Sequence, residues 1–215
     1  MYRTGNYLWI ATRLAGIIKM DLISGQYEHF YAGNGLPTNY IFRITGDNAG
    51  NIYAGTGYEG ALKFDGNTWT VYNTWNSPLP NNDVYCVACD DFGNVWFGTY
   101  LGLAKLSANG VWSVYDSAFT GVPSNYIRTI VPYYYDLLVA TANGGLGILD
   151  IQEETWTVFN TENSNIPSDR VWDIAISDQF SFSIKGGANG TCTLELCTLQ
   201  GKKVGGKNLR FIANR

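Results

Sequence analysis

Charged residues are scarce in this sequence of 215 residues. They make up 15% of the chain, against roughly 25% in an ordinary soluble domain. The charges are also unevenly distributed, because residues 1–178 carry 8 Lys and Arg against 17 Asp and Glu, whereas residues 179–215 carry 6 against 1. A net charge of −9 over the first 178 residues argues against a nucleic acid partner, since binding to a phosphate backbone needs a basic face.

Long hydrophobic runs are missing as well. The most apolar long stretch, residues 129–149, is interrupted by Asp136 and by several glycines and prolines. No segment is therefore long and apolar enough for a membrane span. The first residues lack the apolar core of a signal peptide. The sequence predicts no membrane insertion, and by itself it assigns no compartment.

The groups on which enzymes rely are equally sparse. There is one histidine and no Gly-x-Ser-x-Gly motif, so a Ser or Cys nucleophile would lack its histidine partner. Cys86 and Cys89 have C-x-x-C spacing, but in a strand-like run this odd spacing places the two thiols on opposite faces. Asp90, Asp91 and Asn94 form an oxygen-rich turn that supplies too few ligands for Ca²⁺. We expect no catalytic residue, no metal and no cofactor.

Glycine and aromatic residues are abundant, and they recur with a fixed period. Four strand-like runs end in threonines that are 44, 43 and 42 residues apart. Three further anchors keep this period: a glycine before an apolar run, an aromatic-x-Val-aromatic run, and a proline followed two residues later by Asn or Asp. The threonine, glycine and proline anchors are Thr12, Thr56, Thr99, Thr141, Gly16, Gly60, Gly102, Gly145, Pro37, Pro80, Pro123 and Pro167.

Each period contains four short apolar or alternating runs, which fits one blade of a β-propeller. The second run, such as Val95-Trp96-Phe97, is continuously apolar, as expected for a strand covered on both faces. We predict an all-β fold, a partial or small β-propeller of four to five blades, each with four antiparallel strands and about 43 residues. Residues 1–178 form the repeats, with blade fragments at residues 5–31, 37–73, 80–115 and 123–159 and a last inner strand at residues 170–177.

The ends of the repeat leave two arrangements open. The chain is expected to begin at the second strand of a blade, so that residues 171–176 would pair with residues 7–31 and complete a four-blade ring. Alternatively, residues 180–184, residues 191–197 and a strand near residues 209–212 build a poor fifth blade. Residues 179–215 are thus a divergent tail, either a degenerate blade or a truncated or out-of-frame segment.

The repeat resembles a known family. Gly35-Leu36-Pro37-Thr38-Asn39 and the run Asp-Asp-Phe-Gly-Asn-Val-Trp-Phe-Gly-Thr at residues 90–99 are similar to the two-component regulator propeller repeat, and the resemblance covers residues 5–178. It implies a β-propeller from the sensor region of a bacterial signalling protein or a related surface protein. It also implies a periplasmic or extracellular location.

Candidate ligand-binding residues follow from the direction of the chain. If the strand after each proline is innermost, the proline loops and the loops after the recurring threonines share one rim, and ligands commonly bind where loops converge. Residues that break the repeat on this rim are the informative ones, and flat aromatic faces beside polar groups suit a carbohydrate or another small polar ligand. The candidates are Arg13, Tyr40, Tyr58, Glu59, Trp75, Tyr100, Phe119, Tyr126 and Arg128.

Three functions are compatible with this sequence. The first is a non-catalytic, ligand-sensing or ligand-binding propeller module that binds an oligosaccharide on the rim. The second is a protein-interaction scaffold that has a protein partner or forms a homodimer and binds no small molecule. The third is a propeller lyase, because streptogramin-type lyases have a similar fold. Those lyases depend on histidine and a divalent metal, whereas His29 falls on an outermost strand in a slot that is otherwise valine.

Overall fold

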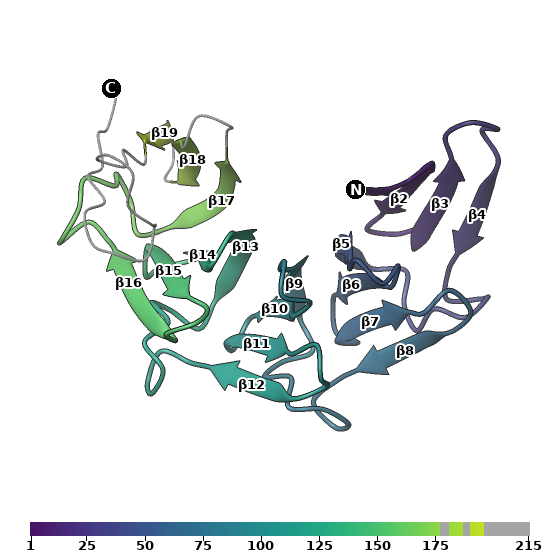
Figure 1. Ribbon diagram of the computed structural model, residues 1–215, viewed down its shortest axis with the longest axis horizontal. Helices are drawn as coiled ribbons and strands as arrows, with labels where there is room; N and C mark the ends of the chain where they lie inside the picture. The colour runs from purple at the N-terminus through teal and green to yellow at the C-terminus, as the bar shows by residue number, and fades with distance from the viewer. Residues whose placement is uncertain (177–180, 187–189, 196–215) are drawn as a thin grey trace. The chain divides into compact units, whose positions relative to one another are not determined.

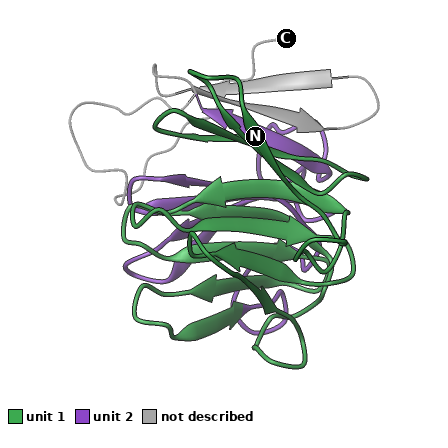
Figure 2. Ribbon diagram, turned by 90° about the vertical axis from the view of Figure 1, so that its right-hand side faces the viewer, with its two compact units in different colours: residues 1–114 green, residues 115–215 purple. Residues whose placement is uncertain are grey.

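Short apolar runs between glycine-rich turns form β-strands throughout the residues that the computed structural model describes, which are 1–176, 181–186 and 190–195. Every helix or strand assigned in these ranges is a strand, so the prediction of an all-β chain is confirmed. The chain divides into two compact units, residues 1–114 and residues 115–215 (Figure 2).

The first unit contains three four-stranded sheets, each built from strands that follow one another in the sequence (Figure 1). The first sheet consists of β1 (Tyr2–Thr4), β2 (Tyr7–Ala11), β3 (Ile17–Asp21) and β4 (Tyr27–Phe30). The second sheet consists of β5 (Ile41–Gly46), β6 (Ile52–Thr56), β7 (Ala61–Phe64) and β8 (Trp69–Tyr72). The third sheet consists of β9 (Val84–Cys89), β10 (Val95–Thr99), β11 (Leu103–Leu106) and β12 (Trp112–Tyr115).

The second unit contains one four-stranded sheet and one three-stranded sheet. The four-stranded sheet consists of β13 (Ile127–Tyr133), β14 (Asp136–Thr141), β15 (Leu146–Asp150) and β16 (Thr155–Phe159). The other sheet consists of β17 (Val171–Ile176), β18 (Ser181–Gly186) and β19 (Gly190–Glu195).

Within each unit the sheets pack as blades of a propeller. In the first unit, the initial strands β5 and β9 of neighbouring sheets contact each other, and β8 forms the opposite, outer edge of its sheet (Figure 1). In the second unit, the initial strands β13 and β17 contact each other in the same way. The predicted fold class, a partial β-propeller, is therefore confirmed, and the strand after each proline is the inner one.

Burial on both faces explains why the second strand of a blade is entirely apolar. One face of the second sheet packs on the first sheet through a cluster that includes Trp9, Ile17, Ile52, Leu62 and Phe64. Its other face packs on the third sheet through a cluster that includes Tyr53, Ala61, Val95, Phe97 and Ala104. Every residue of β6 is buried as a result, and every residue of β10 is buried as well. Each large aliphatic or aromatic side chain in such a core contributes roughly 1.5–3 kcal/mol.

The recurring threonine and glycine close one turn in each blade. Thr56 ends β6, and its hydroxyl donates a hydrogen bond to the Gly60 carbonyl at 2.7 Å while accepting one from the Glu59 amide at 3.2 Å. Gly60 has a φ of +92°, and a Cβ there would lie 2.1 Å from the Tyr72 carbonyl oxygen, so only glycine fits. The same threonine-to-glycine hydrogen bond recurs from Thr12, Thr99 and Thr141.

The polar residue two places after each proline ties the outer loop to the next blade. The Asn82 side-chain oxygen accepts a hydrogen bond from the Thr74 amide at 2.9 Å, and the Asn82 carbonyl accepts one from the Gly60 amide at 2.9 Å. The equivalent side-chain hydrogen bond is accepted by Asn39, Asn125 and Asp169. These anchors are therefore structural, and they fix the loops of the rim.

Asp90 organises the hairpin turn between β9 and β10 on the opposite rim. Its carboxylate accepts hydrogen bonds from the amides of Phe92 and Asn94, from the side-chain amide of Asn94 at 2.8 Å, and from the buried indole Nε1 of Trp96 at 2.7 Å. Asp47 holds the equivalent turn of the second blade. The assignment of these acidic residues to turn formation is confirmed.

One expectation about the ends of the repeat is wrong, and the observed strand pairing decides between the two arrangements left open. The chain begins at the first strand of a blade, because β1 pairs with β2; at three residues, β1 is too short for its pattern to stand out. The pairing partner of β17 is β18, so residues 171–176 do not complete the first sheet. The strands β18 and β19 fall where the alternative placed residues 180–184 and 191–197, whereas the strand expected near residues 209–212 lies outside the described residues.

We expect Asp90→Ala to lower the free energy of unfolding by about 2–4 kcal/mol, because it leaves the buried Trp96 indole N–H without its acceptor and opens the turn. Urea unfolding followed by tryptophan fluorescence measures the loss. Asp91→Ala is the matched control, since Asp91 is an exposed acid in the same turn, and its effect should stay within about 0.5 kcal/mol. Equal losses in the two variants would contradict the proposed role of the Asp90 carboxylate.

Candidate functional site

A β-bulge interrupts four of the inner strands at the same position. In β5 the register shifts between Ile41 and Arg43, which makes Phe42 the extra residue on its strand. The equivalent extra residues in β9, β13 and β17, which together with Phe42 we term the bulge residues, are Tyr85, Arg128 and Trp172. A bulge bends its strand and redirects the extra side chain. Each of these inner strands thus carries a large side chain at the end where the proline loop enters.

In the first unit, the bulge residues join a network of rings. The Phe42 ring lies 5.0 Å from that of Tyr40 and 5.2 Å from that of Tyr85. Tyr40 stacks on Tyr58 with 6.3 Å between ring centroids and 12° between planes. The guanidinium carbon of Arg13 lies 5.9 Å from the Phe42 centroid. Three predicted residues, Arg13, Tyr40 and Tyr58, are therefore brought together on one rim.

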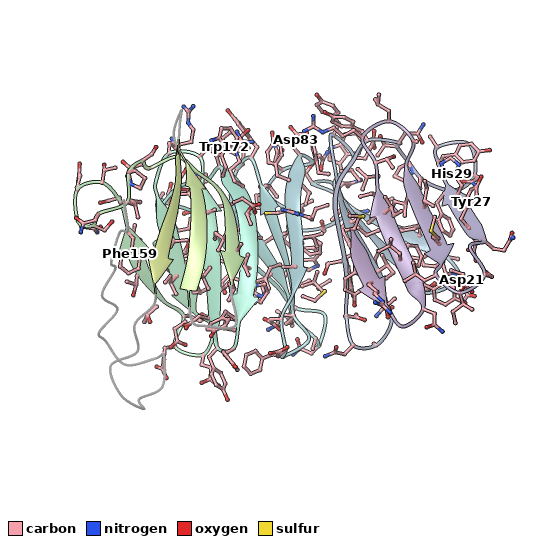
Figure 3. All side chains as sticks on the ribbon, turned by 90° about the horizontal axis from the view of Figure 1, so that it is seen from above. Asp21, Tyr27, His29, Asp83, Phe159 and Trp172 are labelled. Atoms are coloured by element: carbon pink, nitrogen blue, oxygen red, sulfur yellow. The ribbon has the colours of Figure 1, made fainter. Side chains whose placement is uncertain are left out.

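Asp83, which lies directly before β9 at one end of its sheet (Figure 3), connects the loops that carry Tyr58 and Tyr100. Its carboxylate accepts a hydrogen bond from the Tyr58 amide at 3.0 Å, and its carbonyl accepts one from the Tyr100 amide at 3.3 Å. Tyr58 has a φ of 77°, which is uncommon for a residue other than glycine. The side chains of Tyr58 and Tyr100 are 73% and 48% exposed, so Asp83 holds two loops that present aromatic rings to solvent.

In the second unit, an arginine is stacked against two rings. The guanidinium carbon of Arg128 lies 4.0 Å from the Tyr126 ring centroid and 4.3 Å from the Trp172 ring centroid. The Tyr126 carbonyl accepts a hydrogen bond from the Ala142 amide at 3.0 Å, and the Thr129 hydroxyl donates one to the Trp172 carbonyl at 3.0 Å. Two predicted residues, Tyr126 and Arg128, are therefore in contact, and β13 is tied to β17 beside them.

Three further predicted residues take part neither in the ring contacts nor in the Asp83 hydrogen bonds described above. Trp75 is 93% exposed in the loop after β8, and Phe119 is 89% exposed in the loop after β12. Glu59 belongs to the turn that Thr56 closes, and its side chain is exposed. Their proposed contact with a ligand stays a prediction.

Sequence reasoning missed four residues of these clusters, which are Phe42, Asp83, Tyr85 and Trp172. A signal was present, because the second residue of each of the four inner strands is large. The sequence criterion selects residues that break the repeat, so it passes over a position that is large in every repeat. The bulge makes this position informative, since it takes the extra side chain out of the regular ladder.

Residues 78–101 match the family model described as two component regulator propeller. This segment contains Asp83, the bulge residue Tyr85 and the Asp90 turn. This segment is similar to one two component regulator propeller repeat. The resemblance expected from the sequence is thereby confirmed, although a comparison with curated proteins finds no match.

Solved structures with a similar fold include two extracellular domains from B. thetaiotaomicron. One belongs to a hybrid two component system (24% identity, TM-score 0.70, covering 87% of this chain and 25% of that one). The other belongs to a one component system (25% identity, TM-score 0.70, covering 90% and 27%). The β-propeller domain of Cps50 (Swd1) from Myceliophteria thermophila is similar in fold alone (13% identity, TM-score 0.71, covering 98% and 68%). The chain spans about a quarter of the length of the two extracellular domains.

The cysteine thiols and the acidic residues provide little that could serve as a nucleophile or as a metal site. Burial raises the pKa of the Cys86 and Cys89 thiols to about 12, so both are neutral at physiological pH and neither is a ready nucleophile. Within the described ranges there is no group of three His, Cys, Asp or Glu placed to hold a metal ion. In the same ranges, no helix has the length and hydrophobicity needed to cross a membrane.

The fourth propeller repeat departs from the others at the turn between β13 and β14. Three tyrosines, residues 133–135, replace the Asp-x-x-Gly turn, and Asp136 occupies the slot that holds Asn94 in the third repeat. Asp136 is buried and stands opposite Asp150 on the neighbouring strand. Burial, and then the negative charge of Asp150, raise the pKa of Asp136 to about 6.

We expect Asp136→Asn to stabilise the protein at neutral pH and to flatten its pH dependence. The pKa of Asp136 in the folded state, about 6, exceeds that of an unfolded aspartate, about 3.9. Its protonation therefore favours the folded state below about pH 4, and this gain disappears as the pH rises through 6. Between pH 4 and pH 7.5 the wild-type protein should lose about 1–3 kcal/mol more unfolding free energy than the variant. Urea titrations at several pH values test this, and parallel profiles for the two proteins would refute it.

Proposed function

We propose that this chain is a non-catalytic, ligand-binding β-propeller module of a bacterial sensor or surface protein, acting in the periplasm or outside the cell. Its ligand is a carbohydrate or another small polar molecule, bound on the rim of the proline loops. The observation that carries the proposal is the clustering of redirected aromatic and arginine side chains at the inner-strand bulges. The family match and the likeness to extracellular domains of signalling systems support the proposed context.

The chemistry of the first unit's rim suits a sugar. A pyranose ring has apolar C–H faces and hydroxyl edges, so it binds where a flat aromatic surface lies next to fixed polar groups. Tyr58 and Tyr100 supply exposed rings, and Asp83 fixes the position of both. Because these groups are held by backbone hydrogen bonds, little loop ordering would be needed on binding.

The contribution of the module is binding rather than turnover. His29 lies on the outer strand β4 (Figure 3), where its Nε2 is 2.6 Å from the Ala15 carbonyl oxygen. The raised pKa of the Cys86 and Cys89 thiols disfavours thiolate chemistry. The rim residues in contact are aromatic side chains and arginines, which suit recognition better than proton transfer at neutral pH. Among the residues that the structure describes, we therefore find no set that favours the lyase hypothesis.

We expect Tyr58→Ala and Tyr100→Ala each to weaken binding of the best glycan by roughly tenfold or more, since stacking on an aromatic ring supplies much of the contact area. A glycan array of defined oligosaccharides identifies the probe, and isothermal titration calorimetry measures its affinity. Tyr27→Ala is the matched control, because Tyr27 is 66% exposed but lies on β4 (Figure 3). Unchanged affinity in both rim variants would remove the proposed site.

One surface favours the second candidate function, a protein-interaction module. The apolar face of the first sheet carries Leu8, Ile10, Ile18 and Met20, which pair across β2 and β3. The equivalent residues of the second sheet are Ile52, Ala54, Leu62 and Phe64, all buried in the cluster against the first sheet. On the first sheet the four side chains are only partly buried. This face therefore fits another sheet of the same kind, which a second copy of the chain would provide.

We expect the double variant Ile10→Asp with Ile18→Asp to convert a dimer to a monomer if this face mediates self-association. Placing two carboxylates in an apolar interface leaves them without hydrogen-bond partners, which is strongly unfavourable. Light scattering coupled to size-exclusion chromatography measures the mass. A wild-type protein that is monomeric at high concentration would contradict a homodimer, and glycan affinity should be unchanged in the variant.

A further inference from the structure

We propose that one end of the fourth sheet is a docking surface for a basic segment of another protein, which inserts a lysine or arginine side chain there. This end consists of the β13–β14 turn with its flanking residues, 133–136, and the β15–β16 turn, residues 150–154, and we term it the tyrosine turn surface. It lies entirely within the second unit. The basic segment is a partner in addition to the proposed glycan, and its binding does not depend on the glycan site.

The pairing of the strands holds the two turns side by side. Asp136 pairs with Tyr133 across the hairpin and with Asp150 on the neighbouring strand. The Tyr135 carbonyl accepts a hydrogen bond from the Ile151 amide at 2.8 Å, which ties one turn to the other. Residues that stand directly opposite each other on antiparallel strands present their side chains on the same face. The carboxylates of Asp136 and Asp150 therefore share a face of the sheet, next to the aromatic turn.

Asp136 is a buried acid whose charge is not compensated. Its exposed fraction is 6%, and among the residues that the structure describes no hydrogen bond or ion pair satisfies its carboxylate. The residue opposite is a second acid, Asp150, whose Oδ1 accepts hydrogen bonds from the amides of Gln152 and Glu153. A buried carboxylate without a donor, facing a like charge, is unfavourable. Because Asp136→Asn is expected to stabilise the protein, the fold gains nothing from this acid, whereas a partner's positive charge would compensate it.

The neighbouring sequence adds negative charge and no positive charge. No Lys or Arg lies between Arg128 and Arg170, and the exposed Glu153 follows closely after the strand that ends with Asp150. Acids gathered in this way create a negative potential that attracts a cation. Within the described ranges, no group of three His, Cys, Asp or Glu is placed to hold a metal ion, so an organic cation fits the tyrosine turn surface better.

The tyrosines favour a cation that has an apolar stem. Tyr134 is 63% exposed, and its ring lies 4.8 Å from that of Tyr133 with 78° between the planes. Tyr135 is 52% exposed. The methylene groups of a lysine or arginine pack on such rings while the charged head reaches a carboxylate. Tyr134 also has a φ of 53°, a region that Gly93 occupies in the corresponding turn of the third repeat. The needs of the turn therefore do not explain the ring.

Hexalysine and hexaarginine peptides with capped ends, each compared with capped hexaglutamine, test the proposal by NMR titration of the isotope-labelled protein. We expect the largest shifts at residues 133–136 and 150–154. Both cationic peptides should bind roughly tenfold or more tightly than hexaglutamine, with a preference that falls as NaCl is raised from about 50 to about 500 mM. Asp136→Asn and Tyr134→Asn should each weaken peptide binding by roughly fivefold or more. Asparagine tolerates the positive φ at position 134.

Asp91→Asn is the charge-matched control, since Asp91 is an exposed acid in the corresponding turn of the third repeat. Tyr27→Ala is the control for the ring, because Tyr27 is 66% exposed on β4 in the other unit. Both controls should keep their affinity within about twofold, and circular dichroism establishes that every variant is folded. Equal losses in Asp136→Asn and Asp91→Asn would show diffuse attraction to an acidic chain and refute the docking surface, as would equal binding of hexaglutamine. Glycan affinity should be unchanged in Asp136→Asn and Tyr134→Asn, so a failure here leaves the proposed function standing.

Discussion

The second blade packs against a neighbouring sheet on each of its faces, and this constraint decides where functional groups can lie. β6, β10 and β14 are buried along their whole length, so their faces have no room for residues that bind a ligand. The exposed rings of Tyr58 and Tyr100 lie instead in the loops beyond the ends of these strands. Hydrogen bonds made by the recurring threonine, glycine and asparagine residues hold these loops in place. The core of each blade therefore supports a rim whose side chains differ from blade to blade.

Most of the fold was predictable because every blade needs the same residue types at the same positions, so these residues recur with a fixed period in the sequence. Thr56 and Gly60 recur because a hydroxyl must bond one particular carbonyl and a Cβ would strike the Tyr72 carbonyl oxygen. The features that could not be predicted lie at the ends of the chain, where the repeat period carries no information. β1 has three residues and no anchor, and the choice between pairing β17 with β18 or with the start of the chain depends on long-range contacts that local patterns do not encode.

The candidate site was predictable in part, for a related reason. Of the residues chosen because they break the repeat, Arg13, Tyr40 and Tyr58 meet in one ring network, and their role in ligand binding stays a prediction. Phe42, Tyr85 and Trp172 were overlooked because a large residue in a recurring slot normally faces the core. The register shift is what shows that these residues have no partner in the regular strand pairing. A register shift depends on how two strands pair, and the sequence of one strand does not reveal it.

The bulge offers a simple route by which repeats of one architecture come to bind different ligands. Since the extra residue makes no ladder contact that the fold requires, its identity can change from Phe to Tyr, Arg or Trp without disturbing the register on either side. The fourth repeat shows the contrasting case on the other rim. There a change in the turn placed the buried Asp136 opposite Asp150 and raised its pKa, so that substitution carries a cost in stability. The bulge positions thus hold large side chains of different chemistry in one strand register, which supports the proposal that ligand specificity is set there.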